Sequence, residues 1–497
     1  MSARSAPLSE IIVIGGGSAG AVVAARLAEA AVDVVLIEAG PDYGPYDGGR
    51  WPAEILDAAA IATSHDWGYG SGPVEGREPW LWERARILGG CSAHNGAIAA
   101  VGHVSDYDAW RLPGWSTDEL RPLFDRALER MQVRAYGDDE ATPFHARCLA
   151  AARTAGWTIA SDLCDLDANE SFGLETVNIV DGVRWNTAIA YLDPVRNSGR
   201  LRIEASLLVD RIARDGQGWR VDAFGASAGA RRTFRADLVV LAAGVYGTPA
   251  ILQRSGIGDP DHLRSVGVES VVELGAVGEN LHDHPMLHAR RELTDELRSE
   301  LDRAMRDGFV PEEQTLGKAC SSHAADGIFD LHLFPVAASN QTALTDGFAL
   351  IEVACMTPQS RGRVRITSPD PHVAPAIDHG YLTDPDDHDL AVLRDGLVMA
   401  EDLLAQPALA DVLKAGERRD LSDAALRRDV QHYYHPVGTT QMGLDPEASA
   451  CDQRGHVHGT DGLVVADCSL MPQIPRANTN IPAVMIGERI AALLLED

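Results

Sequence analysis

The chain opens with Ile11-Ile12-Val13-Ile14-Gly15-Gly16-Gly17-Ser18-Ala19-Gly20, a short apolar strand that runs directly into a glycine-rich turn. Small residues then predict a helix over about 18–30, and a second apolar strand over 34–37 ends in Glu38. Together these segments predict a βαβ unit that binds a dinucleotide. The motif does not by itself distinguish FAD from NAD.

The predicted cofactor contacts at this end are Gly15, Gly17, Ser18, Gly20 and Glu38. Gly15 permits the tight turn, Gly17 lets the main chain approach the pyrophosphate, and Gly20 allows close packing of the helix on the strand. The start of the helix, where Ser18 lies, faces the phosphates. Glu38 is placed to accept hydrogen bonds from ribose hydroxyls, and its charge disfavours a 2′-phosphate.

Length and composition indicate a large globular protein. The chain has 497 residues, 45% of them hydrophobic and 23% charged, which favours two domains that are interleaved in sequence. A net charge of −30 makes nucleic-acid binding improbable, because it repels phosphate backbones. The same charge either draws a cationic substrate or only keeps the surface hydrated. Seven scattered cysteines indicate reduced thiols and a cytoplasmic location, and no apolar run is long enough for a membrane span.

Hydrophobic patterning predicts further elements along the chain. Helices are expected over about 116–131, 387–405 and 422–432, and strands over 200–213, 219–224, 237–243, 348–356 and 362–366. The charged, mixed stretch 295–326 is expected to be an excursion that covers the active site.

A second small-residue segment is Arg86-Ile87-Leu88-Gly89-Gly90-Cys91-Ser92-Ala93-His94-Asn95-Gly96. Its glycines let the main chain approach a flat cofactor closely. His94 adds a nucleophilic imidazole at that point.

With these segments the chain resembles the glucose–methanol–choline (GMC) oxidoreductases over nearly its whole length. Besides the opening unit, four segments carry the resemblance: residues 86–96, Gly244-Val245-Tyr246-Gly247-Thr248-Pro249 with Ser255-Gly256-Ile257-Gly258, residues 277–285, and the block from His435 through Val457-His458-Gly459 to Asn478-Thr479-Asn480.

The resemblance implies an α/β fold. A Rossmann-like FAD-binding domain is assembled from discontinuous segments, 1–285 and 441–497. A substrate domain over 286–440 has an antiparallel sheet flanked by helices, as in p-hydroxybenzoate hydroxylase. The resemblance also implies FAD as the cofactor. Its further contacts are expected at Gly89, Gly90 and Asn95 along the flavin, Val209 on the adenine side, Asp467 near the pyrophosphate or ribitol, and Asn480 and Pro482 near the isoalloxazine.

The resemblance also bears on how the flavin is held. Within the family, residues 90–95 are most similar to the segment of choline oxidases, whose matching histidine bonds to the 8α-methyl group of the flavin. A neutral imidazole nitrogen at His94 has the chemistry for that bond, and the link would raise the reduction potential of the flavin. The alternative is that His94 only packs or hydrogen-bonds beside the ring.

The resemblance implies His435 and Asn478 as the catalytic pair. Alcohol oxidation requires removal of the hydroxyl proton and hydride transfer from the carbinol carbon to flavin N5. Histidine suits the first task because its pKa lies near neutrality. A neutral amide at Asn478 orients the alcohol and donates to the developing alkoxide. The alternative is that either residue is a core polar group satisfied by the backbone.

The pairs His282/His284 and His456/His458 suggest a metal, because alternate residues of a strand share a face. Both pairs lie in segments that the family uses for its fold, so no metal site is predicted.

The sequence therefore predicts an FAD-dependent oxidase that converts a polar primary alcohol to the aldehyde, with O2 as the acceptor and H2O2 as the product. The alternatives are a dehydrogenase that passes electrons to a quinone or protein acceptor, a lyase that keeps FAD as a structural group, and a non-catalytic flavin-binding protein. The expected partners are a small alcohol and an electron acceptor. Acidity and the choline-oxidase-like segment hint at a cationic or polyhydroxylated alcohol.

Overall fold

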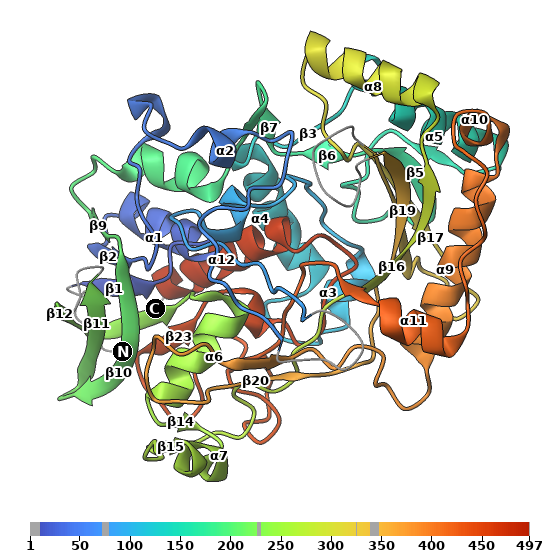
Figure 1. Cartoon of the computed structure of the whole chain (residues 1–497). Coiled ribbons are helices and arrows are strands. Elements are labelled where there is room, and N and C mark those ends of the chain that lie inside the picture. Colours follow the sequence, from blue (N-terminus) through green and yellow to red (C-terminus); the bar gives the residue numbers. More distant parts are fainter. Residues whose placement is uncertain (1–9, 72–78, 226–229, 325, 338–346, 497) are drawn as a thin grey trace.

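The computed structural model describes residues 10–71, 79–225, 230–324, 326–337 and 347–496 (Figure 1). Its first sheet is parallel, with strand order β23-β13-β1-β2-β9. The opening βαβ unit is confirmed. The strands are β1 (Ile11–Ile14), β2 (Val34–Ile37), β9 (Leu201–Glu204), β13 (Leu238–Leu241) and β23 (Leu463–Val465). Segments from both ends of the chain thus form one sheet, as predicted.

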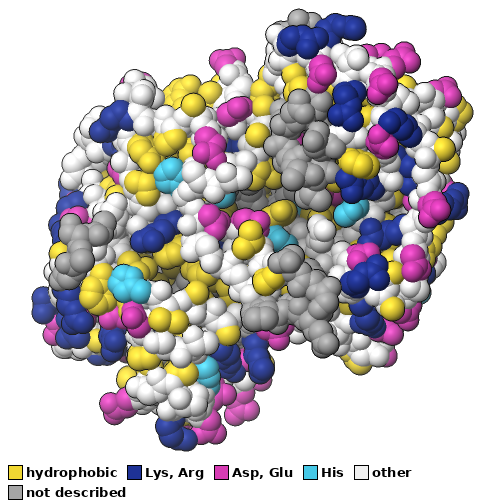
Figure 2. All heavy atoms as spheres, viewed as in Figure 1, with side chains coloured by type: hydrophobic (Ala, Val, Ile, Leu, Met, Phe, Trp, Pro, Cys, Tyr) yellow, Lys and Arg dark blue, Asp and Glu magenta, His cyan; other side chains and the backbone are white. Residues whose placement is uncertain are grey.

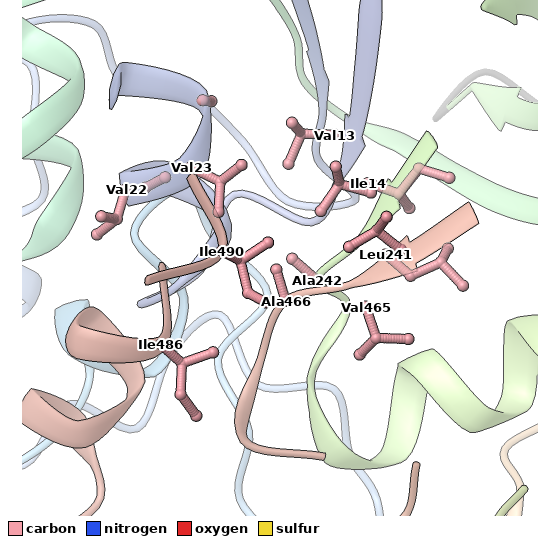
Figure 3. Packing of buried hydrophobic residues seen from close by; sticks show 14 of the residues in the cluster. Val13, Ile14, Val22, Val23, Leu241, Ala242, Val465, Ala466, Ile486 and Ile490 are labelled. Carbon is pink, nitrogen blue, oxygen red and sulfur yellow. The ribbon is translucent and has the colours of Figure 1, made fainter. Parts of the chain in front are cut away.

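Helices α1 (Gly20–Glu29), α12 (Asn480–Glu496) and α4 (Thr117–Arg130) pack together on this sheet. Figure 3 shows Val22 and Val23 of α1 and Ile486 and Ile490 of α12 among side chains of the strands. Each such side chain contributes about 1.5–3 kcal/mol when it is fully buried. An antiparallel sheet of β10 (Leu207–Asp215), β11 (Gly218–Gly225) and β12 (Arg231–Ala236) lies against β1 and β13.

A second sheet has seven strands in the order β22-β16-β19-β18-β17-β5-β4. All neighbours are antiparallel except β4 and β5. The strands are β22 (Gln431–His432), β16 (Pro285–Glu292), β19 (Phe348–Cys355), β18 (Leu331–Val336), β17 (Thr315–Ala319), β5 (Ser171–Leu174) and β4 (Ile159–Ala160). Helices α5 (Pro143–Thr154) and α9 (His388–Leu404) pack on its outer face, and α8 (Asp295–Asp307) and α10 (Pro407–Ala410) contact α5.

Strand alternation decides which side chains of this sheet lie on its inner face, opposite the face that α5 and α9 cover. Leu333 of β18 and Ile351 and Val353 of β19 belong to the hydrophobic cluster that also contains residues of α9. Their sequence neighbours point the other way, because successive side chains of a strand alternate between faces. Phe334 and Glu352, which are register partners, therefore share the inner face.

Two sequence predictions need correction. Residues 295–326 do not form an excursion over the active site, because α8 packs on α5 and β17 is an inner strand between β18 and β5. The helix expected over 422–432 is shorter, α11 (Asp423–Asp429), and His432 lies in β22.

The domain bounds stay a prediction. The boundary at 285/286 coincides with the start of β16, yet β4 and β5, which precede it in sequence, belong to the second sheet. All seven cysteines are free thiols. Among the helices that the structure describes, none has the length and apolar character of a membrane span.

Candidate active site

The two glycine segments predicted to bind the cofactor touch each other. The Gly89 N–H donates to the Gly16 carbonyl at 2.7 Å. A Cβ added at Gly90 would lie 2.6 Å from the Gly17 Cα, and Gly89 and Gly90 both have positive φ values. Only glycine permits this backbone conformation together with so close an approach. The turn after β1 and the start of residues 86–96 therefore form one narrow backbone surface without side chains, which we call the cofactor seat.

The remaining glycines of the opening motif make close backbone contacts. A Cβ at Gly15 would lie 2.3 Å from the Ala242 carbonyl oxygen, and one at Gly20 would lie 2.0 Å from that of Gly15. Glu38 is buried at the end of β2, and its carboxylate accepts the N–H groups of Gly16 at 2.8 Å and Gly40 at 2.7 Å. Burial raises the pKa of Glu38 while these donors oppose the rise. Two carboxylate oxygens retain lone pairs for ribose hydroxyls.

The C-terminal helix closes this seat from the other end of the sequence. Ser18 Oγ donates to Asn480 Oδ1 at 3.0 Å. Asn480 Nδ2 is buried and has no hydrogen-bond partner among the described residues, and Pro482 is buried two residues further along α12. A buried donor without a partner is costly, so its presence points to a group that binds there.

Three other residues that were predicted to contact the cofactor form hydrogen bonds within the protein. The Asp467 carboxylate accepts from the Gly244 N–H at 2.9 Å, Thr248 Oγ1 at 2.6 Å and the Ser469 N–H at 2.8 Å, and its carbonyl accepts the Leu470 N–H at 3.0 Å. The carbonyl of Val209, buried on β10, accepts from Arg254 Nη2 at 3.3 Å. Asn95 Oδ1 accepts the Ala97 N–H at 3.1 Å.

These observations fit FAD. The glycine seat matches a flat, extended ligand, and the orphaned amide of Asn480 supplies an unused donor beside it. The residues that would hold the group lie in the turn after β1, at the end of β2, in α12 and in residues 86–96, and their contacts with FAD stay a prediction.

His94 lies next to the glycine seat with the electronic state that a nucleophile needs. The ring is 6% exposed, and its Nε2 lies 2.7 Å from the Ser64 carbonyl oxygen. A carbonyl only accepts, so we assign the proton to Nε2 and the free lone pair to Nδ1. Burial lowers the pKa of His94, against the effect of the Ser64 carbonyl, and the ring is neutral at physiological pH.

His435 follows the short strand β22 and is held from two sides. Its backbone N–H donates to Asp283 Oδ1 at 2.9 Å. Arg84 Nη2 donates to the carbonyl of Tyr434 at 2.9 Å, and Arg84 Nη1 lies 4.0 Å from Cys91 Sγ. Arg84 thus connects the His435 segment to the segment that carries His94. Tyr434 itself has a φ of 65°, which is strained for an aromatic residue, and such strain concentrates at functional sites.

The imidazole of His435 is neutral and paired with a second histidine. Its Nδ1 lies 3.1 Å from His284 Nδ1. Burial lowers the pKa of His435 well below its usual value, and His284, His332 and Arg84 add to the effect. Burial likewise lowers the pKa of His284 to about 3.

The pair fixes a tautomer, because one neutral ring must donate and the other accept. His284 Nε2 is buried without a hydrogen-bond partner among the described residues, so no second contact of His284 selects the donor, and we assign the shared proton to His435 Nδ1 as the tautomer that leaves Nε2 for a base. His435 Nδ1–H then donates to His284, and the lone pair of His435 lies on Nε2. This is the tautomer that a general base requires.

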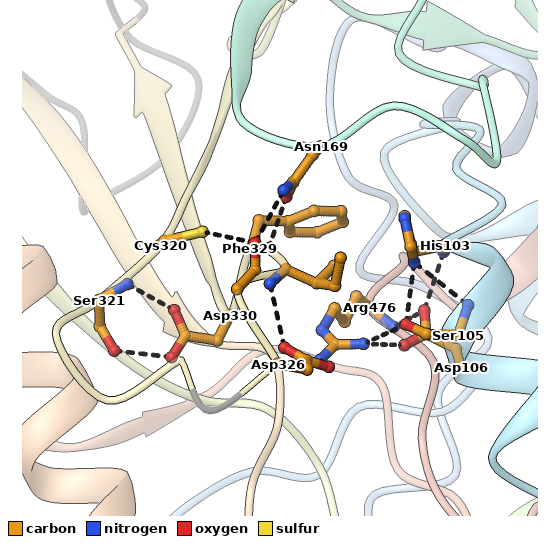
Figure 4. A network of polar contacts seen from close by, with 12 residues as sticks. His103, Ser105, Asp106, Asn169, Cys320, Ser321, Asp326, Phe329, Asp330 and Arg476 are labelled. Atoms are coloured by element: carbon orange, nitrogen blue, oxygen red, sulfur yellow. Dashed lines mark hydrogen bonds and ion pairs between the residues drawn. The ribbon is translucent and has the colours of Figure 1, made fainter.

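Asn478 follows a strongly anchored turn. Arg476 donates to Asp106 and to Asp326 Oδ2 at 2.7 Å, and Figure 4 shows this network joining α3 (Val104–Asp108) to the loop after β17. Two residues later, the Asn478 Oδ1 is buried without a hydrogen-bond partner in the described part of the chain. The amide is therefore available to a ligand. That it converges with His435 over the flavin remains a prediction.

The histidine pairs that suggested a metal have structural contacts. His282 Nδ1 donates to the Asn280 carbonyl at 2.7 Å, and its Nε2 accepts the Ile474 N–H at 3.0 Å, so both nitrogens are engaged. His458 Nε2 pairs with Ser449 Oγ at 3.1 Å.

Sequence reasoning missed Arg84, His284 as the partner of His435, and His332. His284 was read only as half of a metal pair. His332 lies on β18 in an apolar stretch, and only the alternation of that strand places it on the inner face with Phe334.

Comparisons with known proteins identify similar chains. Two family models described as GMC oxidoreductase match residues 9–286 and 358–487. Choline oxidase from Arthrobacter globiformis is 32% identical over 528 residues, covering 98% of this chain and 94% of that protein. An oxygen-dependent choline dehydrogenase from Chromohalobacter salexigens is 31% identical, covering 97% and 94%.

Solved structures show the same fold. Pyridoxine 4-oxidase from Mesorbium loti superposes with a TM-score of 0.84 at 26% identity, covering 98% of this chain and 99% of that one. Formate oxidase from Aspergillus oryzae also has a TM-score of 0.84, at 23% identity, and this likeness concerns the fold alone.

Proposed function

This chain belongs to the GMC oxidoreductase family of FAD-dependent enzymes, and from that premise we propose that it oxidises a polar primary alcohol to the aldehyde. When bound, FAD supplies the hydride acceptor at N5. We propose O2 as the final acceptor, with H2O2 as the product. Relatives named choline oxidase and pyridoxine 4-oxidase support this choice. The seven free thiols favour a cytoplasmic location.

The observation that carries the proposal is the state of His435. A buried, neutral imidazole with its Nδ1 proton committed to His284 offers Nε2 as a proton acceptor. Arg84 connects the main chain before His435 to the segment predicted to line the flavin. A base is thereby brought to the cofactor-binding seat.

The proposed proton movement is short. His435 Nε2 accepts the hydroxyl proton of the alcohol, and the imidazolium formed stabilises the alkoxide oxygen. Asn478 Nδ2 donates to the same oxygen and orients the carbinol carbon, while Asn478 Oδ1, which is buried without a partner among the described residues, is open to a donor group of the ligand. His284 acts as a positioning residue, because it fixes the tautomer of His435 without touching the substrate.

We further propose that His94 is the point of covalent flavin attachment. Its neutral ring carries a free lone pair on Nδ1, beside the seat formed by Gly17 and Gly90. Acid precipitation of the enzyme should leave the yellow colour in the pellet, and His94→Ala protein should release it. A colourless pellet from the unaltered enzyme would leave His94 with only a packing role.

An anaerobic screen of alcohols tests the main proposal. A primary alcohol should bleach the oxidised flavin band, and turnover in air should yield one H2O2 per aldehyde. Bleaching without H2O2, but with rapid reduction of a quinone dye, would favour a dehydrogenase, to which the relatives named choline dehydrogenase lend some support. A flavin that no alcohol bleaches would favour a lyase or a non-catalytic protein.

A further inference from the structure

The inner face of the seven-stranded sheet carries three glutamates from three separate stretches of the chain. Glu352 of β19 is the register partner of Phe334. Glu313 precedes β17 and bridges to Val336 at the end of β18. Glu175 follows β5, and its N–H donates to the Gln314 carbonyl at 2.8 Å. We call Glu175, Glu313 and Glu352 the acidic wall.

The carboxylates of the acidic wall have no partner among the residues that the structure describes. Glu175 is 1% exposed, and neither of its carboxylate oxygens has a hydrogen-bond partner in the described part of the chain. Glu313 and Glu352 likewise form no hydrogen bond or ion pair with a described residue, and both keep partial exposure toward the interior of the site. Unpaired carboxylates at this depth destabilise a fold by several kcal/mol.

The nearest cation does not compensate them. Arg184 acts on Glu313 through space, but its guanidinium donates to the backbone carbonyls of Ile55 at 2.7 Å, Asp57 at 2.9 Å and Ala93 at 3.3 Å. Its two Nη groups are therefore engaged by the main chain, and its buried Nε has no hydrogen-bond partner among the described residues. Arg184 therefore forms no ion pair with the acidic wall.

A separate side chain also points to a ligand at this place. Tyr433 is 5% exposed, and its hydroxyl has no hydrogen-bond partner among the described residues. The carboxyl groups whose charge raises the Tyr433 pKa, after the larger effect of burial, are the three of the acidic wall. The Tyr433 ring lies 6.1 Å from that of Phe334, between centroids, so two aromatic rings border the glutamates.

The acidic wall lies next to the reacting groups. The Tyr433 ring is 4.6 Å from the His435 ring, between centroids. A Cβ added at Gly96 would lie 2.7 Å from Glu313 Oε2, so Glu313 touches the end of the segment that carries His94. In the view of Figure 2, acidic, hydrophobic and histidine side chains lie close together near the middle of the molecule. The wall and the base thus border one site.

We propose that the acidic wall binds a protonated amine of the substrate, so that this enzyme acts on an amino alcohol whose ammonium group carries N–H bonds. The inference rests on the proposed function, since His435 receives the hydroxyl end of the same molecule. An ammonium supplies both the charge and the donors that the carboxylates lack, and aromatic rings favour a cation beside them. A quaternary ammonium supplies charge but no N–H donor, so the unpaired oxygens favour a primary or secondary amine.

Binding of the ammonium group should also release protons from the acidic wall. Burial raises the pKa of Glu175 and of Glu352 to about 8, and in Glu313 the neighbouring carboxyls raise it further, so the wall holds protons when no cation is present. An ammonium favours the ionised carboxylates and expels those protons. The other titratable groups that face the wall are Glu312, Tyr433 and Arg184.

A matched series of alcohols tests the proposal by turnover. 4-Aminobutan-1-ol should exceed pentan-1-ol in kcat/KM by about 10- to 100-fold, as hydrogen bonds to charged groups imply, and should exceed its N,N,N-trimethyl counterpart. Glu352→Gln and Glu175→Gln should reduce this preference to within a few-fold of unity. Glu269→Gln, at an exposed position, is the control and should retain the preference.

Calorimetry tests the same site without turnover. Butylamine binding to the holoenzyme, measured in two buffers with different ionisation enthalpies, should release protons, and Glu352→Gln should bind it about 10-fold or more weakly. Equal kcat/KM values for the amine and neutral alcohols, or equal butylamine affinity in wild type and both variants, would overturn the inference while the proposed oxidase stands. A trimethylated alcohol that matches the primary amine would overturn the requirement for N–H donors. Amine binding with proton release in a protein whose flavin no alcohol bleaches would support the wall and refute the oxidase.

Discussion

The cofactor seat and the acidic wall differ in how far their polar groups are hydrogen-bonded within the protein. Around the seat, most polar groups are paired within the protein: Glu38 accepts two backbone N–H groups, and Asp467 accepts three donors. On the wall, Glu175 and the hydroxyl of Tyr433 are buried with no partner among the described residues. In the cofactor seat, the Asn480 Nδ2 is the group that remains without a hydrogen-bond partner among the described residues, whereas on the acidic wall the functional groups themselves remain without partners.

The difference indicates how each region meets its ligand. Paired groups hold the seat rigid before the cofactor arrives, which lowers the cost of binding. Unpaired groups cost folding free energy and recover it only when a ligand supplies the missing donors. A variant at the seat should therefore impair cofactor binding, and a variant at the wall should alter selectivity and stability.

The largest effect is expected at the border between the two regions. His435→Ala removes the general base and should slow anaerobic flavin reduction by about 10²–10⁴-fold, measured by stopped flow at saturating alcohol. The flavin content should be unchanged, since the seat does not use this side chain. His372→Ala, at an exposed histidine, should reduce the flavin at the wild-type rate. Near-normal reduction in His435→Ala would remove the base from the account.

A methyl group in the seat should abolish the close main-chain approach. Gly90→Ala places a Cβ 2.6 Å from the Gly17 Cα at a φ of 53°, and such overpacking costs about 1–3 kcal/mol. In the His94→Ala background, where no covalent bond retains the flavin, FAD affinity should fall by about 10- to 100-fold, measured by titration of the flavin-free protein. Gly49→Ala is the matched control, because Gly49 has a φ of 65° but open space around its Cβ. Equal loss of FAD affinity in both variants would show that backbone strain, and not the contact, is responsible.

At the wall, removal of a carboxyl should stabilise the unliganded protein. The pKa of Glu175 is raised to about 8, so its contribution to stability is fully present below its unfolded pKa near 4.5 and is lost as pH rises through 8. Glu175→Gln should therefore raise the free energy of unfolding by about 1–3 kcal/mol at pH 9 and by less at pH 5. Urea unfolding at both pH values measures this difference. A lower stability of Glu175→Gln at pH 9 would mean that the carboxyl is a structural group.

The smallest expected effect concerns pH dependence, because kcat/KM should not decrease around the usual histidine pKa. His435 accepts a proton only when neutral, and its pKa is lowered well below 6.5, chiefly by burial. With pentan-1-ol, which carries no ammonium to ionise the acidic wall, kcat/KM should therefore change less than about twofold between pH 8 and 6.5, and fall only as pH decreases further. A half-maximal point at or above pH 6.5 that disappears in His435→Ala would contradict the buried environment.

The same contrast explains what the sequence could predict. The seat was predictable because its main residues are contiguous, and the glycine spacing and the strand ending in Glu38 carry their own geometry. His435 and Asn478 came from family resemblance, and nothing in their local sequence identifies the role. Asp467 was predicted near the cofactor without its carboxylate contacts, because its partners Gly244 and Thr248 are distant in the chain.

The wall could not be predicted because it exists only after strands pair. Glu175 and Glu352 share a face through antiparallel register and alternation across β5, β17, β18 and β19. The error over 295–326 has a similar origin. β17, Thr-Leu-Gly-Lys-Ala, has no alternating apolar pattern, since all five residues, including Lys318, are buried.

The most direct test of the account is a crystal structure of the FAD-bound enzyme with an amino alcohol, in the reduced state so that no turnover occurs. The account predicts His435 Nε2 and the Asn478 amide within about 3.2 Å of the alcohol oxygen, with the carbinol carbon over flavin N5 and the ammonium at Glu352. An isoalloxazine ring on the far side of residues 89–96 from His435, or an alcohol oxygen that contacts neither residue, would contradict it.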